Sequence, residues 1–427
     1  MSSFNKVVGY ESIKKELYQI IDMIKNKDVY EKLGAKMCKG ALLYGVPGLG
    51  KTLMAKCFIQ ESGLETYTIR RNKGNDDFIG LITETFKTAA QNAPSIVFLD
   101  DMDKFANEDS DHTDTAEYVA VQSGIDEVKD YDVFVLATCN DIDKLPDSLI
   151  RAGRFDRRIE VKTPTEQDTI DIIKHYLSDK KVSKDINMED LSKMISYSSC
   201  AELETILNEA AISAAYNRQD VVGMDDIISA VLRKQYNSPD DFEKVSEDSK
   251  RRTALHEAGH LVVSEILNDG SIGLVSIRSS GRDNTHGFTH RCKEEEKWYY
   301  NAMIGLAGKA AVEIFYQTEY ADGCGSDLKK IYNTIRSNIA HNGSCGLSYV
   351  YHNSGWEYGE VAESIKNRNE MLIETEMEKY YLKAKEILTK NIEFLKAVTD
   401  MLVLKETLLY SDIKKIKESV KLVKVEA

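Results

Sequence analysis

The chain has 427 residues and a net charge of −14, from 56 Lys and Arg against 70 Asp and Glu. At about 150 residues per domain, this length predicts two or three domains, and the composition, 42% hydrophobic and 30% charged, excludes a disordered tail. The negative charge repels phosphate backbones, so we expect no nucleic-acid partner.

The sequence also indicates in which cellular compartment the protein is expected. Nothing in it approaches the roughly 18 consecutive apolar residues of a membrane helix, so we expect no membrane insertion. The first residues lack the basic and apolar segments of a secretory signal, and the seven cysteines are scattered without CxxC spacing. These features predict a cytoplasmic protein with reduced thiols.

The first part of the chain is predicted to alternate strands and helices. Apolar residues at helical spacing occupy the first 35 residues, and the apolar run GALLYGV is followed by a glycine-rich turn and another helical pattern. Two further apolar runs are SIVFLD from Ser95 and DVFVLATCN from Asp132. This alternation is typical of a parallel α/β sheet, which we expect over residues 1–162.

The rest of the chain is predicted to be mainly helical. Residues 163–235 have a helical pattern and indicate a small helical subdomain, whereas the polar stretch 236–250 indicates a linker. A second domain is expected over 251–427. It begins with a helix near Leu255 to Leu267, passes through a β-like stretch over 274–291, and ends in helices with a charged face.

A phosphate-binding loop is predicted between the first strand and its helix. The segment GVPGLGKT fits the pattern GxxxxGK[ST], in which backbone N–H groups and the helix N-terminus bind phosphates. Lys51 would neutralise phosphate charge, and Thr52 would bind Mg²⁺. Asp100, at the end of a buried strand, would hold the metal shell, with Asp101 beside it. The residues predicted to bind ATP and Mg²⁺ are Gly45, Val46, Pro47, Gly48, Leu49, Gly50, Lys51, Thr52 and Asp100.

With these motifs the chain resembles the AAA+ ATPases. The resemblance implies that Asn140, which ends VFVLATCN, positions the attacking water. It also implies that RAGRFDRR supplies arginine fingers, Arg154 and Arg157, to the γ-phosphate of a neighbouring subunit. Fingers that act on a neighbour imply a closed ring of subunits.

A zinc site is predicted in the second domain. The segment HEAGH is an HExxH motif with helical periodicity, so His256 and His260 lie on one helical face and can bind one Zn²⁺. Glu257 can then take a proton from the activated water. Spacing alone leaves four candidates for the third ligand, namely His286, His290, Glu313 and Asp327.

A second resemblance decides between these candidates. HEAGH followed by GLAGKAAVEIFY and GCGSDL is similar to the FtsH family of ATP-dependent zinc proteases, which implies that Asp327 completes the site. Glu313 is then expected near the zinc as a supporting or structural group. The likeness extends over nearly the whole chain, from VVGYESIKKEL through the helical lid, SSCAELETILNEAAISAA, to AKEILTKNIEFLKAV.

Three departures from that family stand out. We expect a soluble relative without the membrane helices that precede the ATPase in that family, and the Glu that normally follows the metal-binding Asp is here Asp101, one methylene shorter. NDDFIG resembles the substrate-gripping pore loop and points to Phe78 and Gly80, but the stretch from there to Pro94 is four residues shorter than the family pattern.

We therefore expect an α/β AAA+ module, a parallel sheet with a helical lid, followed by a mainly helical zinc metalloprotease domain. The expected function is ATP-driven unfolding and threading of polypeptides in a homo-oligomeric, hexameric ring that hydrolyses them. Two alternatives remain. One is an unfoldase or chaperone with weak or lost proteolysis. The other is a zinc peptidase whose ATPase domain mainly assembles the ring.

Overall fold

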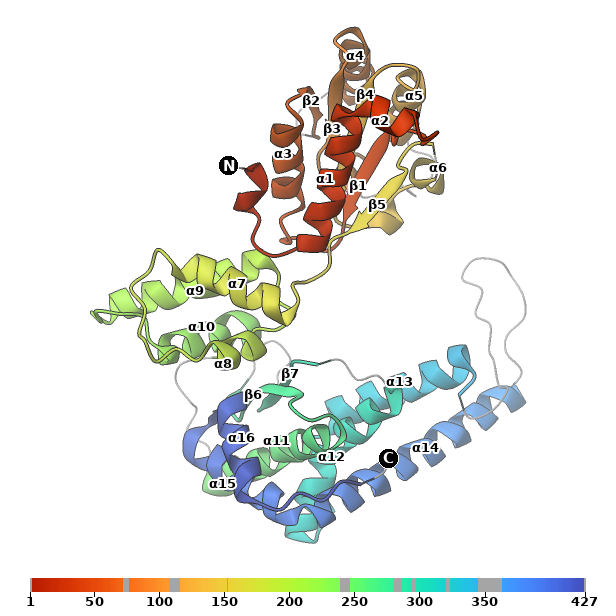
Figure 1. Cartoon of the computed structure of the whole chain (residues 1–427). Helices are drawn as coiled ribbons and strands as arrows, with labels where there is room; N and C mark the ends of the chain where they lie inside the picture. Colours follow the sequence, from red (N-terminus) through yellow and green to blue (C-terminus); the bar gives the residue numbers. More distant parts are fainter. Residues whose placement is uncertain are drawn as a thin grey trace. The chain divides into compact units, whose positions relative to one another are not determined.

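The structure, a computed structural model, places most of the chain in two compact units (Figure 1). The first unit comprises Met1–Lys180 with Tyr197–Asn208, and the second comprises Lys181–Ser196 with Glu209–Ala427. This division passes through the predicted helical lid. The described residues are 2–71, 77–106, 116–151, 153–238, 246–279, 286–293, 297–319, 323–344 and 363–425.

A parallel sheet of five strands forms the centre of the first unit, in the order β2-β3-β4-β1-β5. The apolar runs predicted as strands are β1, β3 and β4, and the last two are buried along their whole length. The predicted α/β fold is therefore confirmed. The strands are β1 (Gly40–Tyr44), β2 (Glu65–Ile69), β3 (Ser95–Leu99), β4 (Val133–Cys139) and β5 (Arg157–Glu160).

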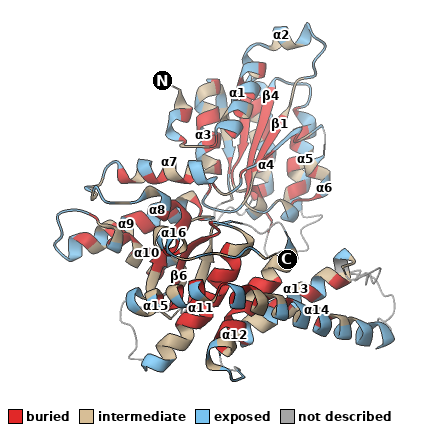
Figure 2. Cartoon of the chain, turned by 60° about the horizontal axis from the view of Figure 1, so that its bottom comes forward, coloured by how far each residue is buried: buried red, intermediate tan, exposed pale blue. Residues whose placement is uncertain are grey.

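Helices cover both faces of this sheet. Right-handed crossovers place α3 on one face and α4 and α5 on the other, and the buried strands lie between them (Figure 2). The helical segments of this part of the chain are η1 (Ser3–Lys6), α1 (Glu11–Lys25), α2 (Lys27–Glu31), α3 (Lys51–Ser62), α4 (Phe78–Gln91), η2 (Met102–Lys104), α5 (Ala116–Glu127), η4 (Ile142–Lys144), α6 (Asp147–Ile150), α7 (Glu166–Leu177) and α9 (Cys200–Tyr216), which continues into the second unit.

The second unit is mainly helical, as predicted, with one small antiparallel sheet in the order β7-β6-β8. Its strands are β6 (Ile272–Ser276), β7 (Phe288–Arg291) and β8 (Thr407–Leu409). Its helices are α8 (Met188–Met194), α10 (Met224–Tyr236), α11 (Glu247–Leu267), α12 (Trp298–Tyr316), α13 (Gly325–Asn342), α14 (Glu363–Lys390), α15 (Ile392–Lys405) and α16 (Tyr410–Ser419). Helix α11 begins inside the predicted linker.

Helix α11 is the central element of the second unit. All of its residues from Ala254 to Glu265 are buried, and α12, α14 and α15 pack around it. A helix that is buried on every side has no polar face to give to solvent, so each polar side chain on it needs a partner inside the protein. None of the helices in the described ranges combines the length and apolar composition that crossing a bilayer demands.

Glu265, near the end of α11, shows how such a partner set is built. Its side chain is almost fully buried, and its carboxylate accepts hydrogen bonds from the backbone N–H groups of Gly270 and Ile272, each at 3.0 Å. The same carboxylate forms an ion pair with Lys417 of α16. One buried charge thus connects α11, the turn before β6 and α16.

We expect Glu265→Ala to lower the free energy of unfolding by about 3 kcal/mol, because it leaves two backbone donors without their acceptor and removes one of the two carboxylates that pair with the partly buried Lys417 ammonium, the other being Asp269. Chemical denaturation followed by circular dichroism measures this change. The matched control is Glu393→Ala, which removes an exposed carboxylate paired with Lys396 at 3.2 Å and should cost under about 0.5 kcal/mol. Equal effects of the two substitutions would contradict this account.

Candidate functional site

The predicted phosphate loop lies between β1 and α3, where the motif requires it. Gly50 precedes the helix with a positive φ of 84°, and Lys51 is the first helical residue. The Lys51 side chain is 5% exposed, and its Nζ donates to the carbonyl oxygens of Gly45 at 2.6 Å and Val46 at 2.8 Å. Burial lowers the pKa of Lys51, although nearby acids partly oppose this. A cation enclosed by its own loop fits a site for phosphate groups.

The second half of this site is centred on the buried Asp100, which follows β3. Its Oδ1 accepts hydrogen bonds from the hydroxyl groups of Thr52 and Thr138, each at 2.9 Å. Thr52 belongs to the phosphate loop and Thr138 to β4. Carboxylate and hydroxyl oxygens are ligands that Mg²⁺ prefers, so Asp100 and Thr52 fit the predicted metal role.

Asp101 lies beside this pair in a left-handed backbone conformation, with φ of 56°. Its backbone N–H donates to Thr138 Oγ1 at 2.9 Å, and Asn140 Nδ2 donates to its Oδ1 at 3.4 Å. Lys104 and Arg70 form ion pairs with its Oδ2 at 2.9 and 3.7 Å. The structure therefore brings Asp101 and Asn140 together, with the Asp101 carboxylate held between two cations.

The two predicted finger arginines have different surroundings. Arg154 is largely buried and forms an ion pair with Asp126 at 2.8 Å, and it also donates to the backbone carbonyl of Ser148. Arg157 is exposed on β5, with a long ion pair of 3.7 Å to Glu16. Only Arg157 is thus presented to solvent in this conformation.

Phe78, predicted to line a pore, is the first residue of α4 and is 5% exposed. Its ring packs edge-on against Phe105 with centroids 5.1 Å apart. Gly80 lies in the first turn of the helix, and its N–H donates to Asp77 at 2.8 Å. The ring packs in the core here, while the neighbouring Ile79, at 42% exposure, and Leu81, at 40%, are apolar side chains that solvent reaches. Residues 75 and 76 of the predicted loop lie outside the described residues.

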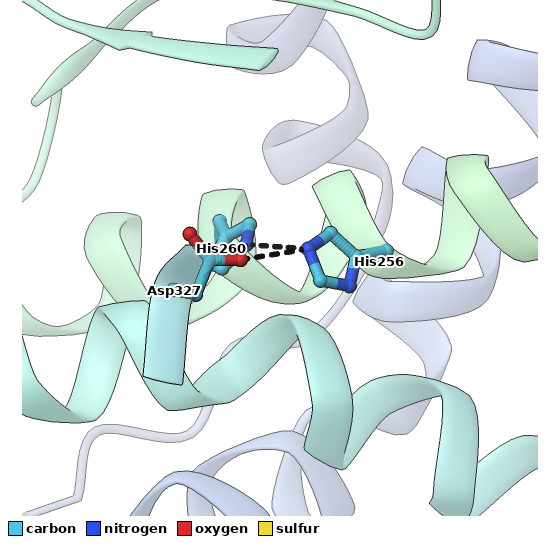
Figure 3. A group of neighbouring side chains, drawn as sticks. All are labelled: His256, His260 and Asp327. Atoms are coloured by element: carbon cyan, nitrogen blue, oxygen red, sulfur yellow. Dashed lines mark hydrogen bonds and ion pairs between the residues drawn. The ribbon is translucent and has the colours of Figure 1, made fainter. Parts of the chain in front are cut away.

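The predicted metal ligands converge on one point in the second unit (Figure 3). His256 and His260 lie one turn apart on α11, and Asp327 lies in the first turn of α13. The His256 and His260 Nε2 atoms are 3.0 Å apart, and Asp327 Oδ2 lies 3.1 Å from the first and 3.5 Å from the second. Ligand atoms about 2.1 Å from a tetrahedral zinc are separated by about 3.4 Å, so this geometry fits Zn²⁺.

Electrostatics at these three side chains also favour a cation. Burial alone lowers the pKa of His260, but the hydrogen bond to Asp327 and the charge of Glu257 outweigh it and raise the pKa to about 9. Burial raises the pKa of Asp327, yet its hydrogen bonds with the two histidines hold that pKa well below its ordinary value. His260 Nδ1 donates to the Ile304 carbonyl at 2.7 Å, which orients the ring and leaves Nε2 for a metal.

The other sequence candidates lie outside this metal-binding group. His290 on β7 is bonded to Ser196 Oγ at 2.9 Å, and burial lowers its pKa to about 4. Glu313 on α12 forms an ion pair with Lys309 at 2.7 Å and accepts a hydrogen bond from Tyr381. These two contacts favour a structural role for Glu313. His286 is an exposed residue before β7.

Glu257, the predicted base, follows the first histidine and is 5% exposed. Thr289 of β7 donates to its Oε2 at 2.8 Å. Neither Thr289 nor Thr138 was found from the sequence, because each acts across 32 or more residues and belongs to no local motif. Thr138 lies near the end of the apolar run DVFVLATCN, and its place opposite Leu43 of β1 is seen only in the structure.

Comparison with known families divides the chain in the same way. Residues 41–163 match the ATPase family associated with various cellular activities (AAA), and residues 243–416 match peptidase family M41. The chain thus carries an AAA ATPase domain followed by an M41 peptidase domain.

Relatives cover nearly the whole chain. It is 30% identical to the ATP-dependent zinc metalloprotease FtsH of Leptotrichia buccalis, over 97% of this chain and 56% of that protein. The proteins of the same name from Malacoplasma penetrans and Helicobacter pylori are 28% and 29% identical over 95% of this chain, and over 52% and 69% of their own lengths. The chain thus spans between about half and two thirds of these relatives. With an AAA ATPase domain followed by an M41 peptidase domain, the chain is similar over nearly its whole length to the ATP-dependent zinc metalloproteases named FtsH.

Proposed function

We propose that this chain is an ATP-dependent zinc endopeptidase that hydrolyses polypeptides. The observation that carries the proposal is the convergence of His256, His260 and Asp327 on one point, with the buried Glu257 beside them. These three side chains would hold Zn²⁺, which supplies a Lewis acid that activates water and polarises a peptide carbonyl.

In this proposal Glu257 is the general acid and base of the hydrolysis. Its carboxylate takes a proton from the attacking water and passes it to the departing amine nitrogen, so that water adds across the broken peptide bond. Strand β7 lies at the edge of its sheet, next to Glu257. We propose that this edge holds an extended substrate through backbone hydrogen bonds, which would tolerate many sequences.

The first unit is proposed to bind ATP with Mg²⁺ and to hydrolyse it. The enclosed ammonium of Lys51 would bind the phosphates, and Thr52 and Asp100 would hold Mg²⁺. Asp101 and Asn140, which contact each other, would position the attacking water.

We further propose a homohexameric ring in which Arg154 and Arg157 reach the nucleotide of the neighbouring subunit. For Arg154 this requires release from Asp126 in its own chain. In this proposal the large ATPase subdomain comprises residues 1–162 and the lid residues 163–235. The linker comprises residues 236–250 and the protease domain residues 251–427.

The scattered cysteines of the chain fit a proposed cytosolic location.

The mechanical part of the proposal is the threading of unfolded polypeptide through the ring. A gripping role for Phe78, beside Gly80, requires its ring to leave Phe105, against which it packs. Ile79, on the same turn, is already exposed and can contact a substrate without that change.

Glu257→Gln is the experiment that tests the proteolytic function. It should abolish cleavage of an unfolded, casein-like protein while zinc content and ATP hydrolysis stay at the wild-type level, because it removes the base and no ligand. Asp327→Asn is the contrasting variant and should lower both zinc content and cleavage, since a neutral amide is a poorer ligand. Metal analysis and a cleavage assay with and without ATP and a chelator give the two readouts. Undiminished cleavage by Glu257→Gln would rule out the assigned base.

The trans role of Arg154 can be tested by mixing variants. Arg154→Ala should stop ATP hydrolysis without preventing nucleotide binding, and mixing it with Lys51→Ala subunits should restore part of the activity. The matched control is Asp126→Asn, which removes the partner of Arg154 within the chain but keeps the finger, and it should retain hydrolysis. If Asp126→Asn is as inactive as Arg154→Ala, the effect is local and the trans assignment fails.

Asp101 is expected to be needed for ATP hydrolysis despite its short side chain. Asp101→Ala should reduce turnover about 100-fold, because a misplacement near 1 Å already costs that much, while small-peptide cleavage by assembled rings persists. Phosphate release measures turnover. The exposed Asp130, in the turn between α5 and β4, provides the control Asp130→Ala. Wild-type ATP turnover in Asp101→Ala would show that another group positions the water.

A further inference from the structure

The carboxylate of Glu257 is held by a residue outside the HEAGH segment. Thr289 Oγ1 donates a hydrogen bond to Glu257 Oε2 at 2.8 Å. Glu257 is 5% exposed, so water does not surround the carboxylate and the hydroxyl is a substantial part of its environment. A threonine hydroxyl on a neighbouring strand can therefore decide where this carboxylate points.

The strand that carries Thr289 is itself fixed on its other side. Phe288 stacks on Tyr236 with ring centroids 3.9 Å apart, and His290 is bonded to Ser196 at 2.9 Å. Side chains alternate along a strand, so Thr289 points opposite to these two neighbours. Pairing of Thr289 with Val275 of β6 sets the register. The hydroxyl is thus presented to Glu257 from a rigid element.

The residue before this strand, Gly287, approaches the second oxygen of the carboxylate. A Cβ added at Gly287 would lie 2.7 Å from Glu257 Oε1, closer than atoms can pack. The absence of a side chain at this position leaves room for Oε1 in its present place. Hydrogen bonding at Oε2 and this clearance at Oε1 together define one orientation of the carboxylate.

We infer that Thr289 is a positioning residue for Glu257, holding Oε2 so that Oε1 receives the proton from water. This inference rests on the proposed endopeptidase function. A glutamate side chain otherwise rotates about its terminal bond, and a base displaced by about 1 Å loses much of its effect. Thr289 contributes no metal ligand and does not touch the reacting atoms.

Three variants test the inference in the full chain loaded with zinc. Thr289→Val removes the hydroxyl but keeps the shape, and kcat for an unfolded protein substrate should fall about 10- to 100-fold. KM and zinc affinity, measured by competition with a chromophoric chelator, should stay within about twofold. Thr289→Ser restores a hydroxyl and should recover kcat to within about threefold of wild type. Thr407→Val, which removes a hydroxyl bonded to Ser276 at 2.9 Å in the same sheet, is the control and should leave kcat unchanged.

Wild-type kcat in Thr289→Val, or equal losses in Thr289→Val and Thr289→Ser, would overturn the inference, because packing and not the hydroxyl would then matter. A wild-type chain that binds zinc but cleaves nothing would instead overturn the proposed function. A second measurement is independent of activity. In the metal-free chain, the shift in unfolding midpoint caused by the double variant should differ from the sum of the shifts caused by Thr289→Val and Glu257→Ala alone. A shift equal to that sum would count against the hydrogen bond.

Discussion

The second unit depends on the burial of three polar side chains in one turn and a half of an apolar helix. His256, Glu257 and His260 lie within the stretch of α11 that is buried on every side, where each unpaired polar group costs free energy. Their partners come from three other elements, namely the Ile304 carbonyl of α12, Asp327 of α13 and Thr289 of β7. The other elements therefore have to pack around α11 so that these groups meet. The arrangement that satisfies the buried polar side chains is thus the same one that assembles the metal-binding residues and the base.

The nucleotide site of the first unit follows the same logic at the end of a sheet. Parallel strands end at a common edge, so Asp100 after β3 and Thr138 in β4 meet the phosphate-loop residue Thr52 after β1. Thr138 is central because its hydroxyl donates to Asp100 and accepts from the backbone of Asp101. One side chain thereby fixes both acids, and Asp101 is held in the left-handed conformation that turns its carboxylate toward Asn140.

The sequence predicted those features whose signal is local. Strands β1, β3 and β4 were found because burial on both faces demands continuous apolar residues, whereas β2, with the partly exposed sequence ETYTI, and β5, with RRIE, have no such run. HEAGH and GVPGLGKT were also found because their signal is local. The two histidines of the first motif lie about one helical turn apart, and the residues of the second form one loop. Asp327 follows His256 by 71 residues, and only the family resemblance pointed to it. The same resemblance singled out Phe78, whose pore role stays a prediction; in the structure it is the first residue of α4 and packs its ring against Phe105.

Burial also explains why the two chemical sites use threonine hydroxyls rather than further charges. A carboxylate in the place of Thr138, beside Asp100 and Asp101, or in the place of Thr289, beside Glu257, would add a like charge to a poorly solvated space. A hydroxyl donates one hydrogen bond to a carboxylate and adds no charge, so it orients the acid while leaving its remaining lone pairs for a metal or a proton. Thr138 and Thr289 both lie on strands, whose stiff β-branched side chains have few rotamers and whose pairing fixes the hydroxyl in space. A threonine hydroxyl on a strand thus orients an acid at the nucleotide site and the base at the peptidase site.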